Sequence, residues 1–313
     1  MTVKHPIICL LGPSASGKTS LAVEMVKRFP CDIISVDSAM VYKGMDIGTA
    51  KPDHHTLEIA PHRLIDMVDP AHAYSAGQFR TDALREIKKI VAQNRIPLLV
   101  GGTMMYFRIL QQGLADLPVQ NPALRQQLQM KANEMGWPAL HKELAAIDPI
   151  AATRIHIHDQ QRIQRALEVY YLTGEAITKQ QQEDTSALQD YAIQHIALYP
   201  KDRNKLHEKI KQRFYGMLEQ GFVKEVERLY ERSDLSITLP SIRSVGYREM
   251  WAYLSSAITY DEMVEQALAS TRQLAKRQMT WLRSFKDISM FDPDASRFLD
   301  DILKYINHDV FKG

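Results

Sequence analysis

The chain has 313 residues, with 39 Lys and Arg against 37 Asp and Glu, so its formal net charge is only +2. Hydrophobic residues make up 45% and charged residues 24%, which is typical of a globular protein. No apolar run is long enough to cross a membrane, and the first residues leave no room for a signal peptide before the first apolar segment. Cys9 and Cys31 lack metal-ligand spacing and are predicted to be buried and reduced. We therefore expect a cytoplasmic protein without membrane partners, and we expect a monomer.

A glycine-rich loop follows the first predicted strand. Residues 12–19 read Gly-Pro-Ser-Ala-Ser-Gly-Lys-Thr, between the apolar run 7–11 and an apolar-periodic helix that begins near Leu21. In this context the backbone N–H groups of the loop and the positive end of the helix form an anion site. Lys18 adds a positive charge, and the Thr19 hydroxyl is placed to ligate Mg²⁺. The sequence predicts a phosphate or diphosphate site here.

Strand and helix patterns alternate after this loop. Residues 31–38 form a β-branched run that contains Asp37 near its end, and residues 96–100 form a buried strand that leads to Thr103. A helix capped by Ser75 lies between them. The alternation predicts a parallel sheet covered by helices, with Asp37 and Thr103 at the carboxyl edge where ligands bind. From position alone, Asp37 could organise a metal, act as a general base, or be a strand-end carboxylate without a ligand.

Strand patterns disappear in the middle of the chain. Residues 114–190 contain helical segments separated by prolines, which indicates a helical insertion domain. The predicted core is therefore discontinuous and consists of residues 1–113 and 191–313. Its later elements are expected to be a strand at 193–199, helices at about 202–232, 243–256 and 260–286, a strand at 288–291 and a helix from about 295.

The helix predicted at 260–286 carries an acid-free basic segment. Residues 266–286 contain no Asp or Glu, whereas a solvated helix face normally mixes both signs of charge. Leu274 and Trp281 lie opposite the cations and are predicted to pack on protein. This pattern favours binding of a polyanion. The cations of the segment are Arg272, Lys276, Arg277, Arg283 and Lys286, and all of them except Arg277 fall on one face of the helix.

Two further basic clusters precede this helix. Arg243 and Arg248 flank a short Ser-Val-Gly-Tyr segment, and Arg162 and Arg165 lie three residues apart on a predicted helix. Three separate clusters fit a long phosphate backbone better than a small ligand. The nearby histidines have no partners at ligand spacing, so we do not expect them to bind a metal. Arg213, on an amphipathic helix, would by itself be an ordinary surface arginine.

Together these motifs resemble the bacterial tRNA dimethylallyltransferases (tRNA isopentenyltransferases), which prenylate the adenosine next to the anticodon. The resemblance extends over almost the whole chain and is far more specific than the glycine-rich loop alone. Ser14 stands where the family more often has Thr, and Ser244 where Cys is frequent. The blocks that carry the resemblance are residues 12–19, 33–38, 42–52, 61–63, 100–103, 161–162, 165–168, 245–248, 271–278 and 281–283.

The resemblance implies a P-loop α/β core with a helical insertion that binds the anticodon stem of tRNA. The loop would hold the diphosphate of dimethylallyl diphosphate, with Lys18, Arg213 and a Mg²⁺ ion on Thr19 neutralising the leaving group. Asp37 would accept a proton from the amine of a flipped-out adenine, and Thr103 would help to hold that base. The diphosphate-binding residues would be Gly12, Pro13, Ser14, Ala15, Ser16, Gly17, Lys18 and Thr19. The tRNA-binding residues would be Asp37, Ser38, Ala39, Met40, Thr103, Arg125, Gln161, Arg162, Ile163, Gln164, Arg165, Arg243, Ser244, Val245, Gly246, Tyr247, Arg248, Arg272, Lys276, Arg277 and Arg283.

Two alternatives use the same motifs differently. An ATP-dependent kinase of a small molecule would use the loop, with the insertion as its lid. A non-catalytic RNA-binding NTPase module would use the loop and the cations. The acid-free helix and the three basic clusters argue against the kinase, because a small substrate needs no such surface.

Overall fold

The structure is a computed structural model that describes residues 4–113, 117–180, 187–285 and 287–309. The chain divides into two compact units. Unit 1 comprises Met1–Gln111 and Ala187–Gly313, and unit 2 comprises Gln112–Ser186. Unit 1 is therefore built from two segments that are separated in the sequence.

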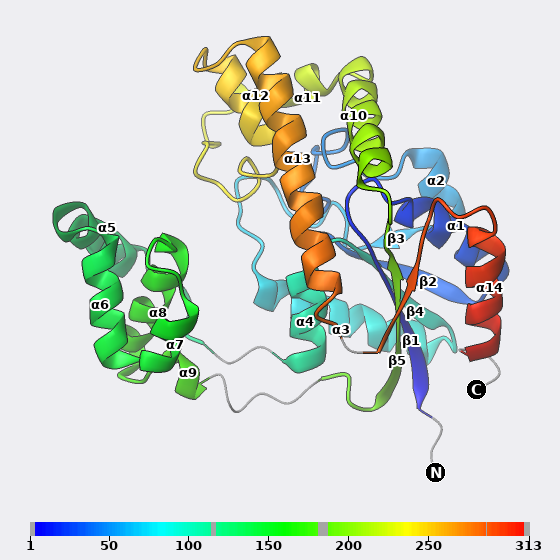
Figure 1. The fold of residues 1–313 in the computed structure, drawn as a ribbon, viewed down its shortest axis with the longest axis horizontal. Coiled ribbons are helices and arrows are strands. Elements are labelled where there is room, and N and C mark those ends of the chain that lie inside the picture. The colour runs from blue at the N-terminus through cyan, green and yellow to red at the C-terminus, as the bar shows by residue number, and fades with distance from the viewer. Residues whose placement is uncertain (1–3, 114–116, 181–186, 286, 310–313) are drawn as a thin grey trace. The chain divides into compact units, whose positions relative to one another are not determined.

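Unit 1 is organised around a sheet in which all pairings of the described strands are parallel (Figure 1). The strand order is β3-β2-β4-β1-β5-β6, so the strand before the glycine-rich loop lies near the middle. β5, the first strand after the insertion, pairs with the whole of β1 through its residues 191–197. This confirms the predicted α/β fold with a helix-covered parallel sheet. The strands are β1 (His5–Leu11), β2 (Cys31–Val36), β3 (His62–Arg63), β4 (Ile96–Gly101), β5 (Tyr191–Leu198) and β6 (Ile288–Phe291).

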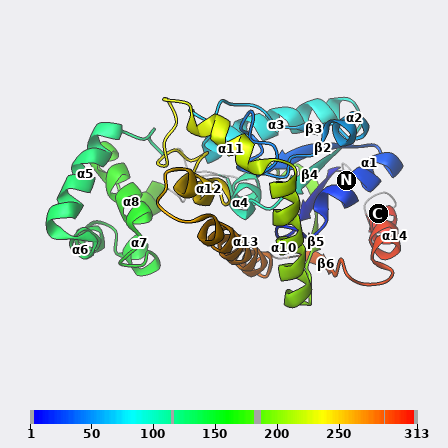
Figure 2. The ribbon, with the colours of Figure 1, turned by 90° about the horizontal axis from the view of Figure 1, so that it is seen from above.

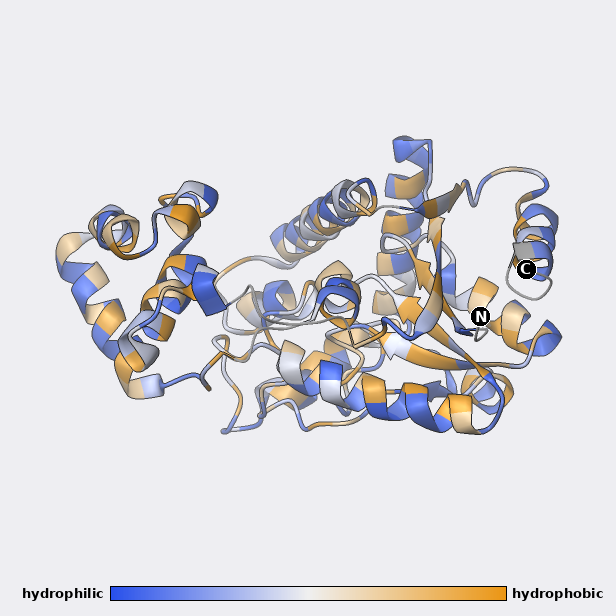
Figure 3. Ribbon diagram, turned by 90° about the horizontal axis from the view of Figure 1, so that it is seen from below, coloured by the Kyte–Doolittle hydropathy of each residue, from blue (hydrophilic) through white to orange (hydrophobic). Residues whose placement is uncertain are grey.

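Helices cover both faces of the sheet because its central strands are apolar on both sides (Figure 3). One face packs against Phe79 of α3 and Phe107 of α4, and the other packs against Met25 of α1 and Ile302 of α14. Ser75 forms the predicted cap of α3, as a capping box. The short α2 was not predicted, because it buries no side chain that would mark it. These helices are α1 (Lys18–Arg28), α2 (His54–Ile59), α3 (Ala76–Ala92), α4 (Met104–Gln112) and α14 (Phe298–Asp309).

The helices between β5 and β6 gather at the carboxyl end of the sheet (Figures 1 and 2). They share a hydrophobic core with Tyr42 and Met45 from the segment after β2. The helix predicted at 202–232 is divided in two, because Gly221 adopts a left-handed φ of 97°. No helix in the described part of the chain, the 23-residue α13 included, combines the length and apolar content needed to cross a membrane. The helices are α10 (Arg203–Glu219), α11 (Phe222–Tyr230), α12 (Tyr247–Leu254) and α13 (Tyr260–Leu282).

Unit 2 contains helices and loops, without strands, in the described residues 117–180. Its small core includes Leu128, Leu140, Leu144 and Ile163. Prolines occupy the first turn of α5, α6 and α7, where the missing N–H group has no helical partner to lose. The helices are α5 (Pro122–Met135), α6 (Trp137–Ile147), α7 (Pro149–Arg154), α8 (Gln160–Thr173) and α9 (Ile177–Gln180).

Candidate active site

A cavity of about 580 Å³ lies in unit 1 at the carboxyl ends of β1, β2 and β4. Its walls come from the glycine-rich loop, the ends of β2 and β4, helices α10 and α13, and the segment before α12. This edge is where open α/β sheets bind their ligands. The predicted site residues that line the cavity are Ser14, Ala15, Lys18, Thr19, Asp37, Ser38, Ala39, Met40, Thr103, Arg213, Arg243, Ser244, Val245, Gly246, Tyr247 and Arg277.

The loop between β1 and α1 has the backbone geometry of an anion site. Ala15 and Gly17 adopt positive φ values of 62° and 88°, and their neighbours do not, so successive N–H groups turn toward one region. α1 begins at Lys18 without a side-chain cap, so the N–H groups of its first turn can donate to an anion. Ser16 is buried, and its hydroxyl has no hydrogen-bond partner among the described residues. The Ser16 N–H donates to the Pro13 carbonyl at 3.3 Å, which tightens the turn of the loop.

The cavity is strongly cationic. Asp37 is the only acidic residue among the described residues that line it. Burial and the charge of Arg213 lower the pKa of Lys18 to about 7, and Asp37 acts in the opposite direction. Burial also lowers the pKa of Arg213, whose side chain is accessible from the cavity but surrounded by protein. An anionic ligand would keep both groups charged, because it would offset their burial and mutual repulsion.

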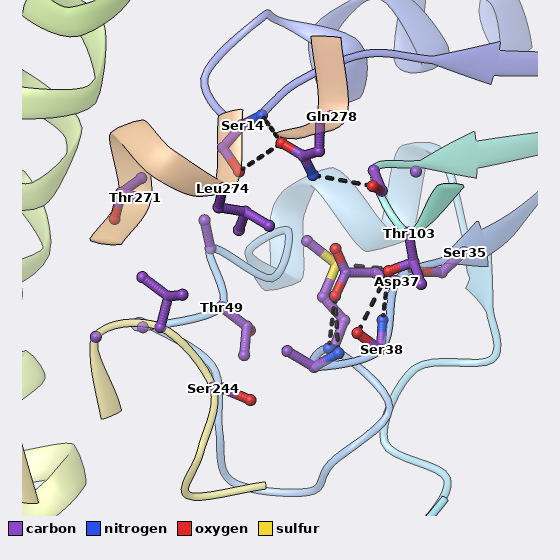
Figure 4. Close-up of a pocket in the computed structure, with 18 of the residues that line it drawn as sticks. Ser14, Ser35, Asp37, Ser38, Thr49, Thr103, Ser244, Thr271, Leu274 and Gln278 are labelled. Carbon is purple, nitrogen blue, oxygen red and sulfur yellow. Dashed lines mark hydrogen bonds between the residues drawn. The ribbon is translucent and has the colours of Figure 1, made fainter. Parts of the chain in front are cut away.

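Asp37 is held by the backbone that follows it. Its Oδ1 accepts hydrogen bonds from the N–H groups of Ala39 at 2.8 Å and Met40 at 3.2 Å. Thr103 Oγ1 accepts a hydrogen bond from the Ser38 N–H at 3.1 Å and lies 3.3 Å from the Ser38 hydroxyl (Figure 4). The two strand ends thus present a carboxylate and a hydroxyl in one part of the cavity, as the sequence predicts.

The residues of the cavity fit a Mg²⁺ ion that would be bound jointly by protein oxygens and by the oxygens of a diphosphate. Among the described residues, no three His, Cys, Asp or Glu side chains are grouped as a metal cage. Thr19 and Asp37 line the same cavity and supply one hydroxyl and one carboxylate. Mg²⁺ is often bound in this way, by one or two protein oxygens together with phosphate oxygens and water.

Helix α13 differs in part from its prediction. Leu274 and Trp281 line the cavity, and Trp281 also packs against the hydrophobic core, as predicted. Lys276 and Arg283 are exposed, as predicted for a surface that binds a polyanion. The Nε atom of Arg272 is buried and has no hydrogen-bond partner among the described residues. Among the described residues, the exposed cationic face therefore depends mainly on Lys276 and Arg283, whereas the exposed Arg277 lines the cavity. Lys286 lies outside the described residues.

The segment 243–248, which ends in the first turn of α12, also divides into exposed and buried residues. Arg243 is exposed and lines the cavity. Arg248 forms an ion pair with the buried Glu249. The Tyr247 hydroxyl donates a hydrogen bond to Glu225 at 2.6 Å inside unit 1. Arg243 is therefore the free cation of this segment among the described residues, whereas Arg248 is already paired.

In unit 2, only part of the predicted RNA-binding set lies on the surface. Gln161 and Arg162 are exposed at the start of α8. Ile163 is fully buried in the core of the unit, so its side chain has no surface to offer to RNA. Gln164 donates a hydrogen bond to the Arg125 carbonyl at 3.1 Å. Of residues 161–165, the first two are therefore exposed, Gln164 and Arg165 are half-buried, and Ile163 is buried.

Arg125 and Arg165 are paired within unit 2. Glu168 is fully buried, and its carboxylate accepts two hydrogen bonds from Arg125, at 2.9 and 3.0 Å, and one from Arg165 at 2.7 Å. The same carboxylate accepts the Asn121 N–H at 2.8 Å, and Arg165 also donates to the Pro118 carbonyl at 2.8 Å. These bonds fix the entry to α5 against α8, so both arginines have a structural role inside the unit.

Two side chains that hold segments around the cavity were not predicted from the sequence. Gln278 connects the glycine-rich loop to the turn after β4, and nothing in the composition of α13 marks it. Glu225 accepts the N–H groups of residues 46–48, which begin the loop that lines the cavity through Thr49. Glu225 could have been found, because it occupies an apolar position of α11 together with Phe222 and Leu229.

The fold and the cavity define a P-loop α/β protein with a cationic site. A sequence model described as IPP transferase matches residues 40–285, and the chain therefore belongs to the IPP transferase family. It is similar to the solved tRNA isopentenylpyrophosphate transferase of Bacillus halodurans, with 33% identity over 99% of this chain and 98% of that chain and a TM-score of 0.72. The solved tRNA delta(2)-isopentenylpyrophosphate transferase of Staphylococcus epidermidis is 32% identical over 98% of this chain and 100% of that chain, with a TM-score of 0.68. A solved eukaryotic dimethylallyltransferase acting on tRNA is 25% identical over 98% of this chain and 77% of that chain, with a TM-score of 0.76.

Proposed function

We propose that the chain transfers a dimethylallyl group from dimethylallyl diphosphate to the exocyclic amine of the adenosine 3′ of the anticodon in tRNA, and releases diphosphate. Family membership and relatives that are named for this chemistry support the proposal. The observation that carries it is the charge arrangement of the cavity, in which Asp37 faces Lys18 and Arg213. The reaction needs these two features, a base for the amine and cations for the diphosphate.

The proposed step forms one bond and breaks one. The adenine amine nitrogen attacks C1 of the allylic diphosphate, the bond from C1 to the diphosphate oxygen breaks, and its electron pair leaves with the diphosphate. The proton of the amine passes to Asp37, and Thr103 orients the base. Lys18, Arg213 and the loop N–H groups stabilise the charge that develops on the leaving group. A Mg²⁺ ion held by Thr19 would add charge neutralisation when bound.

Incubation with bulk tRNA and radiolabelled dimethylallyl diphosphate tests the reaction directly, with labelled ATP as the control for a kinase. Label on tRNA from the first donor supports the proposal, and phosphate transfer from ATP with no prenylated tRNA would refute it. Asp37→Ala should lower the transfer rate by roughly two to four orders of magnitude. The same variant should bind a diphosphate analogue with Mg²⁺ about as tightly as the wild type. A loss of Mg²⁺-dependent affinity would instead assign Asp37 to the metal.

We further propose that unit 2 binds the anticodon stem and that the exposed cations of α13 contact the RNA backbone. Neutralising Lys276 and Arg283 together should flatten the dependence of log affinity for tRNA on log salt, by roughly 0.7 to 0.9 for each phosphate contact removed. Diphosphate affinity should hardly change. We also propose that the enzyme acts in the cytoplasm and as a monomer; the two free, buried cysteines support a reducing compartment.

A further inference from the structure

Gln278 is a buried polar side chain on α13 that bridges two parts of the proposed active site. Its Oε1 accepts a hydrogen bond from the Ser14 N–H at 2.9 Å, and its Nε2 donates to the Gly102 carbonyl at 2.9 Å (Figure 4). A backbone N–H can only donate and a carbonyl can only accept, so these partners fix the orientation of the amide. Only 8% of Gln278 is exposed. One side chain therefore joins three segments that are distant in the sequence.

The turn after β4 is shaped around this amide. A Cβ atom at Gly102 would lie 2.4 Å from the Gln278 Nε2, closer than two such atoms can approach, so a side chain at position 102 would displace the amide from its present position. The Ser14 hydroxyl adds a weaker contact to Oε1 at 3.5 Å. An apolar side chain at position 278 could fill the same space, but it would leave the Ser14 N–H and the Gly102 carbonyl without partners.

The three joined segments carry different parts of the proposed reaction. Ser14 belongs to the loop that would bind diphosphate, and Gly102 precedes Thr103, which is bonded to Ser38 beside Asp37. Arg277, the residue before Gln278, is an exposed cation that lines the cavity. If α13 moved, the Gln278 amide would therefore move both the diphosphate loop and the turn that carries Thr103.

We propose that Gln278 is a positioning residue that couples RNA binding on α13 to diphosphate binding in the loop. The inference rests on the proposed function and adds to it a coupling between the two substrate sites. RNA that fixes α13 holds Gln278 in place, and Gln278 then holds the loop in the geometry that binds diphosphate. By linkage the effect is reciprocal, so diphosphate also strengthens binding of RNA by the same factor.

The test compares the affinity for pyrophosphate with and without an anticodon stem-loop RNA, by calorimetry on the whole chain. The wild type should bind pyrophosphate at least about five-fold more tightly when RNA is present. In Gln278→Met this factor should fall to about one, while each ligand alone still binds. Gln273→Ala is the matched control, because Gln273 is an exposed glutamine of the same helix, and it should keep the wild-type factor.

Gly102→Ala gives a second variant, because its Cβ removes the space for the amide from the other side. It should lose the coupling as Gln278→Met does, and it serves where Gln278→Met does not fold. The inference is overturned if the wild-type factor is about one, or if either folded variant keeps the factor. A wild type that prenylates tRNA but lacks coupling refutes only this inference. A wild type that binds neither pyrophosphate nor RNA refutes the proposed function as well.

Discussion

Arg125 and Arg162 look alike in the sequence but should behave differently when each is replaced by Met. Arg125 donates two hydrogen bonds to the buried Glu168, whereas the Arg162 side chain is 68% exposed and lies 3.5 Å from Asp159. Removing one partner of a buried ion pair costs about 3–5 kcal/mol. Glu168 would keep Arg165 and the Asn121 N–H, so we expect a smaller cost than this for Arg125→Met, about 2–3 kcal/mol.

Hydrogen exchange on the intact chain measures this loss of stability separately for the helices of unit 2. Amide protection in α5 and α8 should fall by roughly 30- to 150-fold in Arg125→Met, since each 1.4 kcal/mol is about tenfold. Arg162→Met should leave protection unchanged and should reduce the salt dependence of tRNA binding by roughly 0.7 to 0.9. If Arg125→Met keeps its protection and instead reduces the salt dependence, Arg125 binds RNA and its pairing with Glu168 is not structural.

Three further predictions concern side chains away from the transfer step. Ser16→Ala should keep or raise stability, because it removes a buried hydroxyl without a described partner; a tenfold loss of pyrophosphate affinity would show that this hydroxyl contacts the ligand. Burial tends to raise the pKa of Glu168, but its two arginines outweigh this and hold it below its ordinary value of 4.5, so unit 2 should lose stability in hydrogen exchange only as the pH falls below about 4.5. Protection that is constant down to pH 3 would contradict this. Glu225→Gln should loosen residues 46–48 and raise KM for tRNA, and Tyr247→Phe, which removes one of the four donors to Glu225, should do so much less.

The sequence was sufficient for the part of the site that depends on strand ends. Asp37 and Thr103 each follow a β-branched or apolar run, and parallel strands bring such positions to one edge. The glycine-rich loop was equally clear, because its glycine and lysine spacing reports a backbone conformation. These features depend on short stretches of chain, and short stretches are what a sequence pattern describes.

Side-chain pairing across the fold could not be predicted in the same way. Arg125 and Arg165 have the same charge as Arg162, and only the position of Glu168 decides that two of them are neutralised inside unit 2. Helical periodicity placed Trp281 on an apolar face, but it could not show that this face borders a cavity. The contact between Gln278 and Ser14 spans 264 residues, so no local pattern contains it.

The turn after β4 shows how the chemistry of the site constrains the backbone. A Cβ atom at Gly101 would lie 2.0 Å from the Val36 carbonyl oxygen, so the ends of β2 and β4 can approach as they do only because position 101 lacks a side chain. That approach lets the Thr103 N–H donate to the same carbonyl at 3.2 Å, and it places Thr103 Oγ1 against the Ser38 N–H. A larger residue at position 101 would separate the two strand ends and carry Thr103 away from Asp37. The glycine is therefore required by the close approach of the two strand ends, which brings Asp37 and Thr103 to the same cavity.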